Sequence, residues 1–90
     1  MLKVRYSAKF KKDFKLIQKR GNDIKLLQEV IVLLCDDHQL PTKKKDHILS
    51  GDYAGHRECH ITPDWLLIYK IEKDILTLSL TRTGTHSDLF

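Results

Sequence analysis

Three of the five histidines of this chain lie within one stretch, residues 45–65, which reads KDHILSGDYAGHRECHITPDW. They are His47, His56 and His60, and a fourth histidine, His86, lies near the C-terminus. The unperturbed pKa of histidine, about 6.5, is closer to neutrality than that of any other side chain. Carboxylates and an arginine accompany these histidines, a composition that indicates proton transfer near a phosphate. The neighbours in question are Asp46, Arg57, Glu58 and Asp64.

Cleavage of RNA by side chains alone requires two proton transfers. The 2′-hydroxyl must lose a proton, the phosphate gains negative charge in the transition state, and the leaving 5′ oxygen must be protonated. Each proton shuttle typically contributes about 10²- to 10⁴-fold to the rate, and a guanidinium presents a planar fork that matches phosphate oxygens. From spacing alone, histidines scattered over the surface remain the alternative. The residues of suitable type are His47, His60, Asp64, His86, Arg57 and Arg82.

Two other kinds of site compete with this hypothesis. His56, Glu58 and His60 alternate along the chain, so on a strand they project to one face as zinc ligands would. No cysteine or aspartate is placed to complete such a site, and we expect no metal and no other cofactor. Cys59 next to His60 resembles a thiol nucleophile with its base, but adjacent strand residues point to opposite faces. We therefore expect Cys59 in the core.

The N-terminal half predicts a strand followed by two helices. Apolar and basic residues alternate over residues 2–6, which is the period of a half-buried strand. Ser7 is a suitable N-cap for a helix that ends at Gly21. Asn22 or Asp23 can cap a second helix, whose apolar stripe runs over residues 24–34. The short turn between the two predicts an αα-hairpin.

The C-terminal half predicts a long loop and then three strands. Residues 42–55 show no sustained period and open with three lysines, so we expect a functional loop there. Strands are predicted over residues 56–61, 65–71 and 75–82, with turns at 62–64 and 72–74. The resulting order, βααβββ, is an α+β fold in which the helix pair lies over one face of an antiparallel sheet. The tail after Arg82 can fold back along that sheet.

Length and composition limit the class of protein. Ninety residues make one domain with one modest core and exclude a second domain. With 41% hydrophobic and 31% charged residues, the chain is typical of a globular protein and not of a disordered tail. The longest apolar run, Val30 to Cys35, is too short to span a bilayer, and the N-terminus lacks the apolar core of a signal peptide. We therefore expect a cytoplasmic protein, in which Cys35 and Cys59 are free thiols.

Basic residues are concentrated at the N-terminus. The first twenty residues hold a single acid, Asp13. A segregated basic surface of this kind suits a polyanionic partner, because each neutralised phosphate releases counterions. The alternative is a helix face that is merely solvated. The basic residues of this segment are Lys3, Arg5, Lys9, Lys11, Lys12, Lys15, Lys19 and Arg20.

A set of short motifs runs through the chain in a recognisable order. The motifs are Tyr6-Ser7, Lys11-Lys12-Asp13, Lys45-Asp46-His47, Gly51, Arg57-Glu58-Cys59-His60, Pro63-Asp64-Trp65, Leu67-Ile68-Tyr69-Lys70, Arg82-Thr83-Gly84-Thr85-His86 and Leu89-Phe90. With these motifs the sequence resembles the YafQ-like branch of the RelE/ParE superfamily of bacterial toxins, which are the toxin halves of type II toxin–antitoxin pairs. The resemblance covers the chain from end to end and implies a single RelE-like domain over residues 1–90.

The resemblance implies a ribosome-dependent mRNA endoribonuclease, or mRNA interferase, that inhibits translation. Its implied partners are the ribosome, mRNA and a cognate antitoxin, with the toxin a monomer alone and a hetero-oligomer with its antitoxin. The implied catalytic group is His47, His60, Asp64 and His86, with His86 as the general acid, His60 or His47 as the base, and Asp64 orienting a histidine.

The same resemblance assigns RNA-binding residues. Arg82 and Arg57 are expected to hold phosphate, although Arg57 can also pair with Glu58 or Asp64. Trp65 and Phe90 are expected to shape the site or stack on a base, the alternative for both being the core. The first helix, with Lys11, Lys12 and Lys15, is expected to contact ribosomal RNA.

Three positions depart from the family pattern. Ile48 stands where the family usually has proline, which could loosen the loop of His47. Glu58 replaces the commoner aspartate, and His56 occupies a position that is often aromatic. None of the three changes removes a proposed proton shuttle.

Two rival functions stay open from the sequence. One is a non-catalytic toxin on the same fold that inhibits a protein target such as gyrase, and such a toxin needs no histidine cluster. The other is a plain nucleic-acid-binding module built on the basic helix, which would depend on its lysines and not on its histidines.

Overall fold

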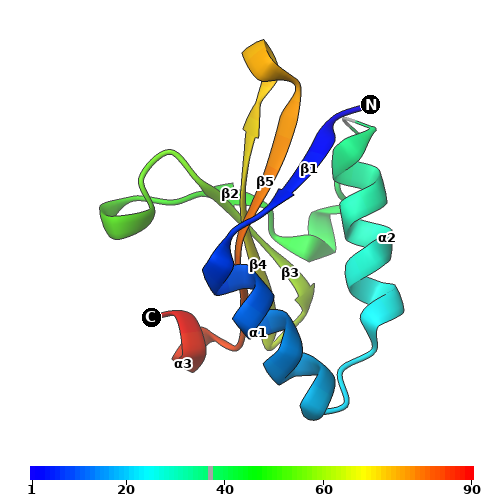
Figure 1. The fold of residues 1–90 in the computed structure, drawn as a ribbon, viewed down its shortest axis with the longest axis vertical. Coiled ribbons are helices and arrows are strands. Elements are labelled where there is room, and N and C mark those ends of the chain that lie inside the picture. The colour runs from blue at the N-terminus through cyan, green and yellow to red at the C-terminus, as the bar shows by residue number, and fades with distance from the viewer. Residues whose placement is uncertain (37) are drawn as a thin grey trace.

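The computed structural model describes residues 1–36 and 38–90. Within these residues the chain forms a five-stranded sheet in the order β1-β5-β4-β3-β2 (Figure 1). β1 pairs with β5 in parallel, and the other neighbours are antiparallel. The strands are β1 (Lys3–Tyr6), β2 (His47–Ile48), β3 (Arg57–Thr62), β4 (Trp65–Glu72) and β5 (Thr77–Gly84). The helices are α1 (Ala8–Lys19), α2 (Ile24–Cys35) and α3 (His86–Leu89), with single 3₁₀ turns η1 (Thr42–Lys44), η2 (Gly51–Tyr53) and η3 (Lys73–Ile75).

Both long helices begin where their caps predict. The Ser7 hydroxyl accepts the backbone N–H of Phe10 and donates to the carbonyl of Thr81, so it caps α1 and ties it to β5. The Asp23 carboxylate accepts the N–H of Lys25 at the start of α2. Gly21 lies between the helices at φ +81°, a conformation that glycine adopts without strain. The predicted αα-hairpin is therefore confirmed.

The sheet has two differently covered faces. α1 and α2 pack on one face and form the main core with side chains from the three central strands. A smaller cluster lies on the other face, where Leu89 of α3 covers Leu66 and Ile68, and Leu49 and Tyr53 pack beside them. In Figure 1, α2 and α3 accordingly lie on opposite sides of the strands. The core residues supplied by the strands are Cys59, Ile61, Trp65, Leu67, Tyr69, Leu78 and Leu80.

The predicted α+β class and the order of the main elements are confirmed, and the structure adds short elements. The predicted loop over residues 42–55 holds η1, η2 and the two-residue strand β2, which extends the sheet beyond β3. The tail forms α3. β5 starts at Thr77 and not at residue 75, because Leu76 is in the left-handed conformation at φ +49° and 61% exposed. Among the described residues no helix is both long enough and apolar enough to cross a membrane.

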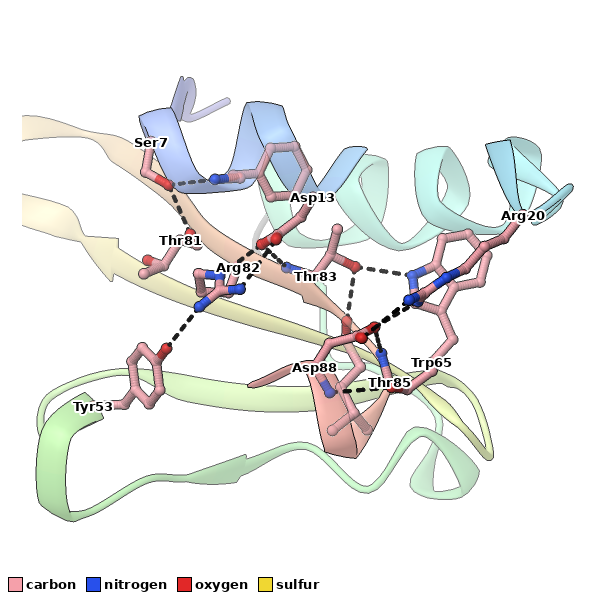
Figure 2. A network of polar contacts seen from close by, with 12 residues as sticks. Ser7, Asp13, Arg20, Tyr53, Trp65, Thr81, Arg82, Thr83, Thr85 and Asp88 are labelled. Atoms are coloured by element: carbon pink, nitrogen blue, oxygen red, sulfur yellow. Dashed lines mark hydrogen bonds and ion pairs between the residues drawn. The ribbon is translucent and has the colours of Figure 1, made fainter. Parts of the chain in front are cut away.

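α3 is held by one carboxylate. Asp88 accepts the backbone N–H of Thr85 at 2.8 Å, and its own N–H donates to the Thr85 hydroxyl, which makes a capping box. The Arg20 guanidinium at the end of α1 binds the same carboxylate through two contacts of 2.6 and 3.1 Å (Figure 2). A Cβ at Gly84 would lie 2.8 Å from Asp88 Oδ2, so only glycine permits this approach. The position of His86, the first residue of α3, depends on these contacts.

We predict that acid loosens α3 before the rest of the fold. Arg20 and Thr85 lower the pKa of Asp88 well below its ordinary value. Their stabilising effect is present above the unfolded pKa of about 3.9 and is lost as the pH falls below it. Backbone amide spectra recorded during an acid titration should show the Thr85 amide losing its hydrogen-bonded shift while amides of β4 are unchanged.

The Asp88→Asn variant is the control for this titration. It should lack the acid transition of α3 at every pH. A wild-type Thr85 amide that stays unchanged down to global unfolding would contradict the prediction.

Candidate active site

The register of four strands brings several of the predicted site residues to the face that α3 covers. Glu58 on β3 lies opposite Ile68 on β4, and Ile68 lies opposite Arg82 on β5. On its other side Glu58 pairs with His47 of β2. His60 projects to the same face as Glu58, since the two are separated by one residue. Glu58 and Arg82 therefore flank Ile68 at two strand spacings, which is about 10 Å between their backbones.

The loop that carries His47 is fixed by its neighbour Asp46. The Asp46 carboxylate accepts the Tyr69 hydroxyl at 2.6 Å and the Nε–H of Arg57 at 3.2 Å. Burial and this carboxylate raise the pKa of Tyr69, and the same carboxylate raises the pKa of Arg57. His47 Nδ1 lies 2.7 Å from the carbonyl of Lys45. Ile48, in place of the family's usual proline, therefore follows a loop that is anchored from both sides.

Glu58 lies beneath two imidazoles. Its Oε1 is 3.5 Å from His47 Nε2 and 3.8 Å from His60 Nε2, while the residue is only 4% exposed. The other ring nitrogen of His60, Nδ1, lies 3.4 Å from the carbonyl of Pro63. Glu58 Oε2 is buried, and among the described residues it has no hydrogen-bond partner. A carboxylate and two histidines thus converge on one side of Ile68.

Arg82 lies on the other side of Ile68 and is held by α1. Its Nε and Nη2 donate to the Asp13 carboxylate at 2.7 and 3.1 Å, and its Nη1 lies 3.4 Å from the Tyr53 hydroxyl (Figure 2). Asp13 also accepts the backbone N–H of Thr83, and its hydrogen bonds raise the pKa of Arg82 above the ordinary value. The guanidinium edge that bears Nη1 faces Tyr53 and not the ion pair.

A bulge in β5 explains why Arg82 reaches this face. Tyr69 pairs with Leu80, but the next partner of Ile68 is Arg82, so Thr81 is left out of the register. Strict alternation would place Arg82 on the same face as Leu80, in the core under the helices. The extra residue reverses the alternation and turns Arg82 toward the α3 side.

Aromatic rings connect Arg82 with α3. The rings of His86 and Phe90 lie 4.9 Å apart between centroids, and Phe90 meets Tyr53 edge-on at 5.9 Å. Tyr53 in turn contacts the ring of His56 at 6.2 Å. Phe90 is 59% exposed, as a surface that stacks on a base must be. The hydroxyl of Tyr53 and its ring thus join Arg82 to the Phe90–His86 pair.

The remaining predicted residues lie outside these two groups. Asp64 is exposed in the turn between β3 and β4, and within the described part of the chain its carboxylate makes no hydrogen bond. Trp65 is 4% exposed and belongs to the main core, where its Nε1 donates to the Thr83 hydroxyl. The predicted lysines of α1 are exposed on its surface, and these are Lys11, Lys12 and Lys15.

A basic hollow of about 340 Å³ lies beside His60. Lys43, Lys44 and Lys45 line it together with Pro63. Lys44 Nζ donates to the carbonyl of Ile61 at 2.8 Å, which fixes η1 against β3. The lysines that open the predicted functional loop therefore reach one rim of the histidine group.

The structure bears on both competing site types. Cys59 is fully buried, and burial raises the pKa of its thiol to about 12, so it is a core residue as expected. Cys35 and Cys59 are both free and buried. No group of three or more His, Cys, Asp or Glu side chains among the described residues is arranged to hold a metal ion.

Three contributors to the site were not predicted from the sequence. Asp13 is the only acid among the first twenty residues, and that isolation was the available signal for a partner of Arg82. The spacing of Thr85 and Asp88 is that of a capping box and could have predicted α3. Tyr53 carried no local signal, because its contacts come from β5 and α3.

Comparison with known proteins decides the family. The family described as "Bacterial toxin of type II toxin-antitoxin system, YafQ" matches residues 2–90. The chain belongs to the YafQ toxin family. The mRNA interferase toxin YafQ of Escherichia coli strain K12 is 43% identical over 88 residues, which span 97% of this chain and 94% of that protein. The predicted family is therefore confirmed, and this relative's name agrees with the predicted endoribonuclease.

Solved YafQ-family structures share the fold. A metal-bound toxin from Helicobacter pylori is 48% identical with a TM-score of 0.94, and the match covers 100% of each chain. The toxin in the E. coli DinJ–YafQ complex is 42% identical with a TM-score of 0.90, over 100% of this chain and 99% of that one. That complex pairs a YafQ toxin with its antitoxin. The two groups of side chains that flank Ile68 thus lie on a YafQ fold.

We predict that Asp13→Ala destabilises this YafQ protein by about 1–3 kcal/mol. The substitution leaves the Arg82 guanidinium and the Thr83 N–H without their acceptor in a partly buried position. Urea unfolding, monitored by tryptophan fluorescence, measures the decrease in the free energy of unfolding. The control is Glu29→Gln, which removes an exposed acid of α2 and should leave the free energy of unfolding within about 0.5 kcal/mol of wild type. Equal midpoints for the two variants would rule the role out.

Proposed function

We propose that this toxin is a ribosome-dependent mRNA endoribonuclease that uses histidines for general acid–base catalysis. The observation that carries the proposal is the placement of two sets of side chains around Ile68. His47 and His60 lie on one side, and Arg82 lies on the other, joined through Tyr53 to the rings of Phe90 and His86. A scissile phosphate above Ile68 would have proton acceptors on one side and a cation with a proton donor on the other. This is the arrangement that cleavage through the 2′-hydroxyl requires.

The proposed reaction moves two protons. His60 or His47 removes the proton of the 2′-hydroxyl, and the 2′ oxygen then forms a bond to phosphorus. The bond from phosphorus to the 5′ oxygen breaks, and His86 donates a proton to that oxygen. The products are a 2′,3′-cyclic phosphate and a 5′-hydroxyl. Asp64, in the turn next to His60, orients that histidine once RNA is bound.

Substrate contacts complete the proposal. Arg82 presents its Nη1 edge to the phosphate while Asp13 holds the opposite edge. Because the side chain is already fixed, it loses little conformational entropy when RNA binds. Phe90 stacks on a base, an interaction typically worth about 1–3 kcal/mol. Arg57 and the lysines of η1 neutralise flanking phosphates. Trp65 shapes the site from beneath, because its ring supports Thr83 in β5.

The partners follow from the surface and from the relatives. The exposed lysines of α1 contact ribosomal RNA, by counterion release. The protein acts in the cytoplasm, where translated messages are found. A cognate antitoxin neutralises it, as the E. coli complexes of DinJ with YafQ suggest, and the free toxin is a monomer.

A non-catalytic toxin that inhibits gyrase is the rival on the same fold. A binding surface has no use for a buried carboxylate beneath two imidazoles, and this group is what favours the nuclease. A plain nucleic-acid-binding module would need only the lysines of α1. The two rivals share one expectation, which is that histidine substitutions leave toxicity intact.

We predict that His86→Ala abolishes cleavage of messages without unfolding the protein. Brief induction in a bacterial host, followed by mapping of mRNA 5′ ends, should show new in-frame cuts with wild type and none with the variant. His38→Ala, which removes an exposed histidine remote from the site, is the matched control and should cut as wild type does. Growth arrest without cuts, unchanged in His86→Ala, would point to a bound protein target instead.

We further predict a bell-shaped dependence of the cleavage rate on pH, with its maximum near neutrality. One limb reports a histidine that must be neutral and the other a histidine that must be protonated. Single-turnover cleavage by purified toxin on translating ribosomes measures the profile, and ribosome integrity is checked at each pH. A rate that rises steadily with pH would exclude a histidine general acid.

A further inference from the structure

We propose that Glu58 is a positioning residue that holds the His47–His60 pair and balances the proton which the pair removes from the 2′-hydroxyl. This inference rests on the proposed function and assigns a residue that the resemblance left without a role. Glu58 touches no substrate in this scheme, because it is 4% exposed and lies beneath both rings. It acts through the imidazoles.

The hydrogen bonding of His47 defines which nitrogen faces Glu58 and in what state. Nδ1 lies 2.7 Å from the Lys45 carbonyl, and since a carbonyl only accepts, Nδ1 carries a proton. Nε2 is left to face Glu58 Oε1 at 3.5 Å. An ionised carboxylate also only accepts, so this contact becomes attractive when Nε2 gains a proton. The ring is therefore placed to become an imidazolium.

His60 repeats the arrangement at longer range. Its Nδ1 faces the Pro63 carbonyl at 3.4 Å, and its Nε2 faces the same Glu58 oxygen at 3.8 Å. Both distances exceed those of good hydrogen bonds, which catalytic groups often form only when substrate is bound. Each imidazole thus lies between a backbone carbonyl and one shared carboxylate.

Because Glu58 is buried, the two neighbouring imidazoles are the groups that can balance its negative charge. Within the described part of the chain it forms no ion pair with lysine or arginine, and its Oε2 has no hydrogen-bond partner. A buried carboxylate without compensation is costly, so a positive charge on either imidazole is stabilised here. One carboxylate balances one imidazolium, and in this scheme that imidazolium is the one formed when either histidine takes the 2′-hydroxyl proton.

The consequence for the reaction is a stabilised proton acceptor. When an imidazole takes the 2′-hydroxyl proton, Glu58 stays ionised and neutralises the imidazolium while negative charge develops on the phosphate. Buried carboxylates that orient a histidine do the same for other nucleophilic reactions. Glutamate also reaches farther than the family's usual aspartate, so its carboxylate lies close to both rings.

The test compares Glu58→Gln and Glu58→Asp with wild type in two measurements. The first is single-turnover cleavage on translating ribosomes over a range of toxin concentrations. Glu58→Gln should slow the maximal rate by roughly 10- to 10²-fold with an unchanged half-saturating concentration, and Glu58→Asp should restore part of the loss. Glu72→Gln, an acid of β4 remote from the site, is the matched control.

The second measurement follows imidazole nitrogen signals of the free toxin from pH 5 to 8. Without the carboxylate, the imidazolium forms of His47 and His60 should disappear at lower pH in Glu58→Gln than in wild type and in Glu58→Asp. The other titratable groups on this face are His56, which directly precedes β3, and, across Ile68, Arg82 with Tyr53, and all are common to the three proteins. This readout is independent of cleavage.

The outcomes separate this proposal from the function on which it rests. If His86→Ala abolishes cleavage but Glu58→Gln cleaves and titrates like wild type, the role of Glu58 is overturned while the nuclease stands. If Glu58→Gln fails to fold, Glu58→Asp decides. The shorter side chain moves the carboxylate away from both rings, so an Asp variant that cleaves and titrates like wild type would also overturn the role of Glu58. Titration shifted and rate reduced, with wild-type backbone spectra, supports the proposal.

Discussion

The ion pair between Asp13 and Arg82 is the contact that relates the helices to the site. It joins α1, which lies on the core side, to a guanidinium that the β5 bulge has turned to the opposite side (Figure 2). Because Asp13 also accepts the N–H of Thr83, one carboxylate fixes both the side chain and the backbone at the bulge. The basic surface of α1 and the cationic half of the site are consequently parts of one rigid unit.

A second carboxylate plays the corresponding part for α3. Asp88 is bound by Arg20 at the end of α1 and by the Thr85 backbone, so α1 contacts the site from its middle, at Asp13, and from its C-terminal end, at Arg20. Asp46 fixes the loop of His47 through Tyr69 and Arg57. Two short elements, α3 and the loop of His47, are thus each held in place by one carboxylate.

Sequence patterns predicted the elements that depend on local signals. Ser7 and Asp23 are helix caps in the sequence and in the structure, and the periods of the helices and the continuous apolar run of β4 were long enough to be recognised. β2 has only two residues, which is too short to show a period, and its pairing with β3 comes from tertiary structure. The left-handed Leu76 disrupted an apparent alternation that included it.

The residue types of the candidate site can be recognised in the sequence, but its geometry cannot. His47, His60, Arg82 and His86 were recognised because titratable and cationic side chains are informative wherever they occur. Their grouping depends on the bulge at Thr81, which no residue in that segment predicts, and on Asp13, which is 69 positions from Arg82. The position of the buried Glu58 beside His47 and His60 likewise depends on strand pairing that the sequence does not show.

The parallel pairing of β1 with β5 has a consequence for the order of folding. A ribosome releases β1 and α1 first, yet Ser7 finds its partner Thr81 only 74 residues later. Closing so long a loop is costly in entropy before the contacts are made, so the first strand and the first helix cannot be fixed until the last strand has emerged. During synthesis, therefore, Asp13 lacks its partner Arg82, and the sheet is incomplete until β5 has emerged. The fold of a chain built in this way is completed late, once its last strand is available to pair with the first.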